Sequence, residues 1–338
     1  MNFRTEMKRA VTPRAALLVV GVLVLQLLFI ASYVGALHHP KPKDVPFGVV
    51  APSTVSAQLV GELEKMPGEP LDARVVADEA TAREQIAQRE IDGALVVNPA
   101  GRTDTLLVAS GGGSALSTGL EKMITKVEAA QNRQVNTVDV APVAAGDFNA
   151  LTAFYLVVGW CVGGYICASI LAVSSGSRPD NKPRALIRLG ALAVSAVLGG
   201  LGGAIIVGPV LNALPGSIAA LWGLGALVVF GVGALTLALE SIFGIVGIGL
   251  AILLIVVMGN PSAGGAFPLP MLPPFWQAIG PFLPPGAGTW AARSIAYFQG
   301  NALGSSLLVL GFWAALGSAV TLAMARPRRP RDTAAVTS

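Results

Sequence analysis

The sequence predicts an α-helical polytopic membrane protein of about six transmembrane helices, with an α+β extracytoplasmic domain inserted between the first and second helix. Two observations support this fold class. Only 12% of the 338 residues are charged, whereas soluble globular chains carry about 25%. Charged residues are common in residues 38–147 and sparse in several long apolar blocks. The chain therefore divides into a membrane part and one soluble domain.

Six apolar stretches are predicted to span the bilayer, because about 20 apolar residues in a helix cross its hydrocarbon core. They are residues 15–37, 148–173, 185–211, 218–239, 242–258 and 303–325. Only Glu240 and Ser241 separate the fourth stretch from the fifth, so the sequence leaves open whether these are two helices or one kinked unit. The first stretch exceeds the roughly 7–15 apolar residues of a signal peptide. We therefore expect an uncleaved anchor, although Val34-Gly35-Ala36 resembles a cleavage site.

The basic residues orient the predicted helices, because loops on the cytoplasmic side are enriched in lysine and arginine. Residues 1–14, the 174–184 loop and the 326–338 tail carry mainly basic charges, whereas residues 38–147 carry more acidic than basic ones. This pattern predicts a multi-pass protein of the inner cell membrane with both termini in the cytoplasm. Because no basic segment is interleaved with stacking aromatics, membrane lipid rather than nucleic acid is the expected partner.

The domain at residues 38–147 is predicted to alternate strands with amphipathic helices. Ser53, Asp78 and Ser114 are suited to begin helices, because short polar side chains accept hydrogen bonds from the free N–H groups at a helix start. Leu120 lies at the centre of the apolar face of the third helix. The strands are expected at residues 47–50, 74–77, 93–97 and 105–109, with a further candidate at residues 137–140.

Two glycine pairs mark the predicted membrane helices. Gly159 and Gly163 lie four residues apart in the second helix, as do Gly199 and Gly203 in the third. Small residues at this spacing let helix backbones approach closely within a membrane. The pairs predict helix-packing contacts inside one subunit, with a substrate path or a dimer seam as the alternatives.

Residues 259–302, between the last two predicted helices, are rich in proline and aromatic residues. Proline interrupts helical hydrogen bonding too often here for a full span, while the apolar composition argues against a free loop in water. We expect a re-entrant or interfacial element on the outer side, the alternative being an ordered surface loop. Its candidate functional residues are Asn260, Pro261, Trp276, Pro284, Pro285, Gly286, Arg293 and Tyr297.

Signatures of catalysis and cofactor binding are missing from the sequence. It has no phosphate-binding G-x-x-x-x-G-K-[ST] loop, and its two histidines are the adjacent His38 and His39. We find no paired carboxylates of matched burial, so we expect no enzyme activity, cofactor or metal. Among ionisable residues only Glu240 comes close to a span interior, at a predicted inner boundary. This argues against a proton-coupled pump and favours an apolar or amphiphilic cargo, with energy supplied by another chain.

Two cytoplasmic elements are candidates for coupling to an energy source. Phe3, Met7 and Val11 share one face of a helix that suits the membrane interface. The loop between the second and third helices carries the basic residues Arg178, Lys182, Arg184 and Arg188. These residues either dock on a partner or serve only as positive-inside anchors.

The layout of one helix, a large outer domain and five further helices resembles the type-2 ABC exporter permease superfamily. The sequence is similar to the branch of YhgE/Pip and nitrosoguanidine-resistance-type membrane proteins in residues 82–86, 92–95, 259–265, 283–287 and 293–298. The resemblance implies a fused outer domain, a homodimer and re-entrant elements between the last two helices. It does not by itself imply an ATPase partner.

The sequence leaves two functions open. The first is the permease-like subunit of an ABC-type exporter for lipophilic compounds or cell-envelope components, energised by a separate ATPase. The second is a non-transporting membrane scaffold or receptor whose outer domain binds envelope or secretion partners. The sequence determines neither the cargo, nor the direction and mechanism of transport, nor the existence of an ATPase partner.

Overall fold

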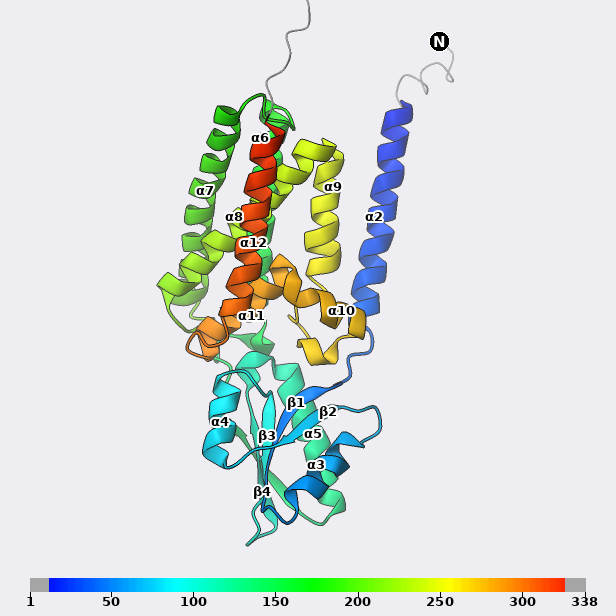
Figure 1. Ribbon diagram of the computed structural model, residues 1–338, viewed down its shortest axis with the longest axis vertical. Coiled ribbons are helices and arrows are strands. Elements are labelled where there is room, and N and C mark those ends of the chain that lie inside the picture. Colours follow the sequence, from blue (N-terminus) through cyan, green and yellow to red (C-terminus); the bar gives the residue numbers. More distant parts are fainter. Residues whose placement is uncertain (1–11, 326–338) are drawn as a thin grey trace, which may run out of the picture.

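A computed structural model describes residues 12–325 and shows a mostly helical chain with a small mixed sheet at one end (Figure 1). Five helices in this range are long and apolar enough to cross a membrane. The predicted interfacial face of Phe3, Met7 and Val11 and the 326–338 tail lie outside the described residues. The five helices are α2 (Pro13–Leu37), α6 (Thr152–Ser175), α7 (Lys182–Ile205), α8 (Ile218–Phe243) and α12 (Gly304–Met324).

The small domain is built on a five-stranded sheet of order β2-β1-β3-β4-β5. β1 runs parallel to both β2 and β3, β4 is antiparallel to β3, and β5 is parallel to β4. The predicted alternation of strands and helices is confirmed, including the last strand, which begins earlier than expected. The elements are β1 (Val45–Val50), α3 (Ser56–Glu64), β2 (Leu71–Val75), α4 (Glu79–Ala87), β3 (Gly93–Val96), β4 (Thr103–Val108), α5 (Ser114–Ala130) and β5 (Gln134–Asp139).

The sheet has an apolar core on each face. Phe47 and Leu95 pack with Leu120 of α5 on one face, while Ile86 of α4 packs on the other. Distant parts of the chain complete both cores: Met271 joins the first and Phe298 the second. The domain therefore depends on residues far beyond position 147, which the sequence pattern did not indicate.

The remaining helices form a bundle around α8, which contacts α6, α7 and α12. Helix α2 stands apart from that bundle (Figure 1), and only 6% of its most apolar stretch is buried. Near its C-terminal end, the Ser32 hydroxyl donates a hydrogen bond to the carbonyl oxygen of Val257. Most of the apolar surface of α2 is therefore left uncovered by the described residues.

The open question about the fourth and fifth stretches is settled by Gly244. Helix α8 ends at Phe243, and Gly244 adopts a left-handed conformation with φ +64°, which reverses the chain. The returning helix α9 (Val246–Ile252) packs back on α8 and continues as a π-helical turn, Leu253–Gly259. These 14 residues reach about 21 Å at the helical rise, which is less than the hydrocarbon thickness of about 30 Å. The prediction of a full span at residues 242–258 is therefore wrong.

Residues 259–302 fold into short helices that lie between the bundle and the sheet domain (Figure 1). The two α-helices among them are α10 (Pro274–Ile279) and α11 (Pro284–Tyr297), and most of α11 is buried. Close backbone contacts need glycine: a Cβ on Gly280 would overlap the carbonyl oxygen of Ser262, and one on Gly286 that of Gly280. The segment is thus a packed structural layer rather than a surface loop.

Candidate functional site

Arg89, which follows α4, connects the sheet domain to α11 through ring stacking and hydrogen bonds. The Arg89 guanidinium lies 3.3 Å from the centroid of the Trp290 ring, which is close cation–π stacking. Its Nη1 also donates hydrogen bonds to the Trp290 carbonyl oxygen at 2.9 Å and to Ser294 Oγ at 2.7 Å. Nearby, Asn301 Nδ2 donates to the carbonyl oxygen of Ala87 at 3.0 Å. The sheet domain is therefore positioned on the short-helix layer by specific polar contacts.

A second contact joins the end of the domain to the C-terminus of α11. The Tyr297 hydroxyl donates to Asp147 Oδ2 at 2.5 Å, and Asp147 Oδ1 accepts from the backbone N–H of Thr152 at 2.7 Å. A side chain on Gly111 would overlap the Tyr297 ring, and one on Gly113 would overlap Pro268. The glycine-rich run before α5 therefore allows the domain and the short-helix layer to approach closely.

Between these layers lies a cavity of about 220 Å³, here called the junction cavity. Arg89 and Asp92 from the domain, and Trp290 and Arg293 from α11, contribute to its lining. Arg293 is 3% exposed. It donates through Nη1 to the Gly264 carbonyl, and through Nη2 to those of Gly265 and Ala150, over 2.7–3.0 Å. Its Nε has no hydrogen-bond partner among the described residues.

The charges around the junction cavity perturb one another. Burial lowers the pKa of Arg89 to about 9, and the neighbouring positive charge of Arg293 acts in the same direction. Burial also raises the pKa of Asp92 to about 6, although Arg89 opposes that shift. Two cations therefore share the cavity with Asp92, whose carboxyl group ionises at a higher pH than usual.

Only part of the predicted site in residues 259–302 belongs to the cavity. Gly286 and Arg293 line it, and Tyr297 makes the adjacent domain contact. Trp276 instead packs edge-on against Phe275, with 5.0 Å between ring centroids. The other predicted residues do not line the cavity; they are Asn260, Pro261, Pro284 and Pro285.

Arg89, Asp92 and Trp290 are among the lining residues that were not predicted as site residues from the sequence. The sequence does contain a signal for Asp92, because this residue begins one of the segments on which the family resemblance rests. Arg89 gives no signal in the sequence, since it follows α4 among other charged residues of an ordinary domain surface. Its role depends on α11, about 200 residues further along the chain, at Trp290 and Ser294.

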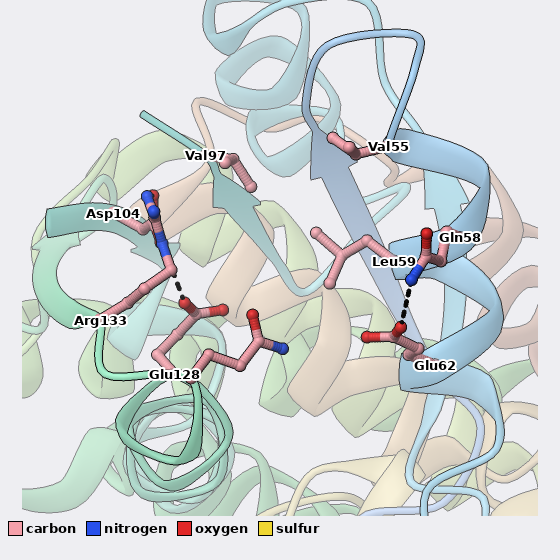
Figure 2. A pocket seen from close by; sticks show the side chains of 9 residues that line it. Val55, Gln58, Leu59, Glu62, Val97, Asp104, Glu128 and Arg133 are labelled. Atoms are coloured by element: carbon pink, nitrogen blue, oxygen red, sulfur yellow. Dashed lines mark hydrogen bonds and ion pairs between the residues drawn. The ribbon is translucent and has the colours of Figure 1, made fainter. Parts of the chain in front are cut away.

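The sheet domain carries a second, larger cleft of about 440 Å³ between α3 and α5 (Figure 2). On one wall, Arg133 donates to the fully buried Asp104 through Nε and Nη2, each at 2.5 Å, and Asp104 also accepts from Asn98 N at 2.7 Å. Glu128 lies beside this pair, 3.5 Å from Arg133 Nε. Asp104 and Glu128 are both buried, so the conclusion that the chain has no such carboxylate pair is wrong.

Burial, reinforced by the neighbouring Asp104 carboxylate, raises the pKa of Glu128 to about 7. A carboxyl group with a raised pKa stabilises the fold while protonated, and that contribution is lost as the pH rises through about 7. We therefore expect Glu128→Gln, a neutral mimic, to unfold at a higher temperature than wild type at about pH 8, with little difference at about pH 5. Thermal unfolding of the full chain tests this.

Glu62→Gln on the opposite, exposed wall of the cleft is the matched control, and its pH profile should follow wild type (Figure 2). A Glu128→Gln variant whose difference from wild type is the same at both pH values would contradict the assignment of the proton to Glu128.

Three of the four predicted packing glycines make no close contact within the described residues. A Cβ on Gly159 or Gly163 would meet nothing within 4 Å, and one on Gly199 only Val229 at 4.0 Å. Of the four, only Gly203 is in tight contact, with the Trp160 ring. Three of them, Gly159, Gly199 and Gly203, instead line an apolar groove of about 520 Å³ between α6 and α7.

The close helix contacts use neighbouring glycines, one residue along from those predicted. A Cβ on Gly164 would lie 2.6 Å from the carbonyl oxygen of Val229, and one on Gly200 would lie 2.5 Å from the backbone nitrogen of Ala226. One residue turns the helix by about 100°, so Gly164 and Gly200 face α8, whereas Gly163 and Gly199 lie on a different face of their helices.

Basic residues of the loop between α6 and α7 make contacts within the bundle that the sequence did not predict. Arg188 is buried and donates through Nη2 to the carbonyl oxygen and Oγ of Ser175, at 2.9 and 2.8 Å. Arg184 pairs with Asp180, and Arg178 Nη2 lies 3.5 Å from Met324 Sδ. Arg188 is therefore a structural residue, which leaves the other basic residues of the loop as candidates for docking.

A buried charge inside the bundle also differs from expectation. Glu240 is 1% exposed, under the returning helix α9, where Ser169 is a polar neighbour. Arg188 interacts with it electrostatically. The membrane-length helices therefore do contain buried charge, so the argument against proton coupling from an absence of such charge no longer holds.

These features define a helical protein with five membrane-length helices, whose small mixed-sheet domain rests on a layer of short helices. In comparisons with protein-family models, curated proteins and solved structures, nothing matches the chain. The geometry of the junction therefore carries the functional conclusion.

Proposed function

We propose that this chain is the permease-like membrane subunit of an exporter for lipophilic compounds or cell-envelope components, energised by a separate ATPase. The junction cavity supports this most directly, because it lies where a fused domain meets broken helices. Helices that are interrupted within a membrane are tolerated where they are buried in protein or line a cavity. In transporters, such interrupted helices form binding sites. The sequence holds no nucleotide-binding loop, so the energy comes from another chain.

In this proposal the sheet domain lies outside the cytoplasm, in an inner-membrane protein with both termini inside. The start of α2, the α6–α7 loop, the α8–α9 turn and the end of α12 lie at the end of the bundle opposite the sheet domain (Figure 1). The basic loop residues occupy that end, as the positive-inside rule requires. Helix α9 and the short helices after it together return the chain to the outer side.

Two further features fit a carrier of apolar molecules. The open groove between α6 and α7 is lined mainly by apolar side chains. Helix α2 leaves most of its apolar surface free. We propose that a second copy of the chain covers part of this surface in a homodimer, in line with the family resemblance.

The alternative function is a non-transporting scaffold or receptor. The cleft between α3 and α5 favours it, because this open, mostly polar cavity lies on the sheet domain and is lined by Gln58, Glu62 and Glu128 (Figure 2). Such a cleft suits a ligand that binds outside the membrane without crossing it.

Reversing two charges at the start of α7, in Lys182→Glu/Arg184→Glu, is expected to reduce the amount of copurifying ATPase by about tenfold or more and to abolish export. Both residues lie at the cytoplasmic end in this topology, and reversing charges at an interface costs several kcal/mol. Pull-down in mild detergent at matched membrane levels measures the effect.

The control carries the same number of reversals on the exposed face of α5, in Lys122→Glu/Lys126→Glu, and should retain the ATPase. An ATPase that stays bound to the first double variant would exclude the loop as the coupling element. Absence of any ATPase from the wild-type sample would favour the scaffold.

A further inference from the structure

We propose that the junction cavity binds the acidic head group, a phosphate or a carboxylate, of an anionic amphiphile. This inference rests on the proposed function, because it names the chemical class of the cargo. The observation that carries it is the convergence of two guanidinium groups, Arg89 and Arg293, on one small cavity between the sheet domain and α11.

Neighbouring carboxyl groups offset the charges of the two arginines only in part. Arg293 donates its hydrogen bonds to backbone carbonyls, which satisfy its N–H groups without cancelling its charge. Asp147 attracts Arg293 but does not line the cavity. Of the two carboxyl groups in the lining, Asp44 is exposed, and Asp92 is the one beside Arg89. Two positive charges held close together in a partly buried site favour a bound anion.

Arginine is the side chain best suited to this ligand, because its planar fork matches the oxygens of a phosphate or carboxylate. Arg293 offers a further donor in its buried Nε, which has no hydrogen-bond partner within residues 12–325. Stacking on Trp290 fixes the Arg89 guanidinium at the cavity wall. The site is thus arranged before any ligand arrives.

The size and position of the cavity fit a head group rather than a whole lipid. Its volume of about 220 Å³ is below the roughly 300–1,000 Å³ of sites that enclose a drug-sized molecule. Pro268 and Leu269 form part of the lining on the side of the short-helix layer. The acyl chains of a bound amphiphile would therefore remain outside the cavity, in contact with apolar surface and lipid.

The test measures binding to the purified full chain in mild detergent, with short-chain phosphatidylglycerol, short-chain phosphatidylcholine and inorganic phosphate as probes. We expect phosphatidylglycerol to bind and stabilise the protein, and the net-neutral phosphatidylcholine to bind at least tenfold more weakly. Arg89→Gln should raise the dissociation constant for phosphatidylglycerol about tenfold, the effect of losing one charge-assisted contact. Arg83→Gln, on the exposed face of α4, should leave it unchanged.

Asp92→Asn provides a test of opposite sign, because removing a carboxylate beside Arg89 makes the cavity more positive. We expect it to tighten binding of phosphatidylglycerol several-fold, an outcome that a damaged fold cannot produce. Equal affinity for the two lipids, unchanged binding in Arg89→Gln, or weaker binding in Asp92→Asn would overturn the proposal. Inorganic phosphate that binds as tightly as phosphatidylglycerol would overturn the assignment to an amphiphile.

This measurement separates the head-group site from the proposed function, since binding needs no ATPase. If binding fails while the Lys182→Glu/Arg184→Glu reversal abolishes export, only the cargo class is wrong. If binding holds while no ATPase copurifies with wild type, the site stands as a lipid site and the permease assignment falls.

Discussion

Leu120→Asp is expected to unfold the sheet domain. Leu120 is fully buried between α5 and the sheet, against Phe47 and Leu95. An unpaired carboxylate at this position loses its hydration and gains no partner, so the expected cost exceeds about 4 kcal/mol. That is a large part of the roughly 5–15 kcal/mol that holds a typical domain together.

Limited proteolysis of the full chain measures this effect, and new cuts within residues 45–139 are the expected result. Val75→Asp is the matched control, because it places the same charge on the same sheet at a side chain that is 53% exposed. Its cleavage pattern should follow wild type. A Leu120→Asp chain as resistant as wild type would show that α5 does not bury this face.

The full chain is the proper sample for this measurement. Met271 and Phe298 belong to the two cores of the domain, so an excised domain would expose the surfaces that they cover. Unfolding of an excised fragment would therefore mix the effect of the substitution with the loss of these contacts.

Gly200→Ala is expected to destabilise the helix bundle by about 1–3 kcal/mol, the usual cost of overfilling a packed interior. The new Cβ would lie 2.5 Å from the backbone nitrogen of Ala226 and 2.9 Å from the carbonyl oxygen of Trp222 on α8. Because both atoms are backbone, α7 and α8 must separate to make room. Dispersion contacts along that pair of helices would then be lost.

Gly199→Ala is the matched control, because its Cβ would meet only Val229 at 4.0 Å. Alanine is the better helix former, so this change should be neutral or slightly stabilising. Thermal unfolding followed with a thiol-reactive dye reports on the bundle through Cys161, which is buried in it. We expect a midpoint lower by about 5 °C for Gly200→Ala. Equal midpoints for the two variants would contradict the glycine register described here.

The sequence by itself determined the features that depend on local composition and periodicity. Runs of apolar residues identify membrane-length helices because the bilayer sets their length, and five of the six predicted stretches have a matching helix. Alternating strands and amphipathic helices were placed because each must bury one face on a shared core. The full span predicted at residues 242–258 is absent, because apolar content does not reveal the reversal of the chain at Gly244.

Only the tertiary structure decided which surfaces meet. Small residues occur on all faces of α6 and α7, so the sequence could not tell Gly199 from Gly200, although a single residue changes the face of the helix. The junction cavity joins Arg89 to Trp290 and Arg293 across about 200 residues, and no local pattern links them. Glu240 lies near a helix end yet is buried, because α9 folds back over it. Long-range packing sets burial, and burial sets the electrostatics of a site.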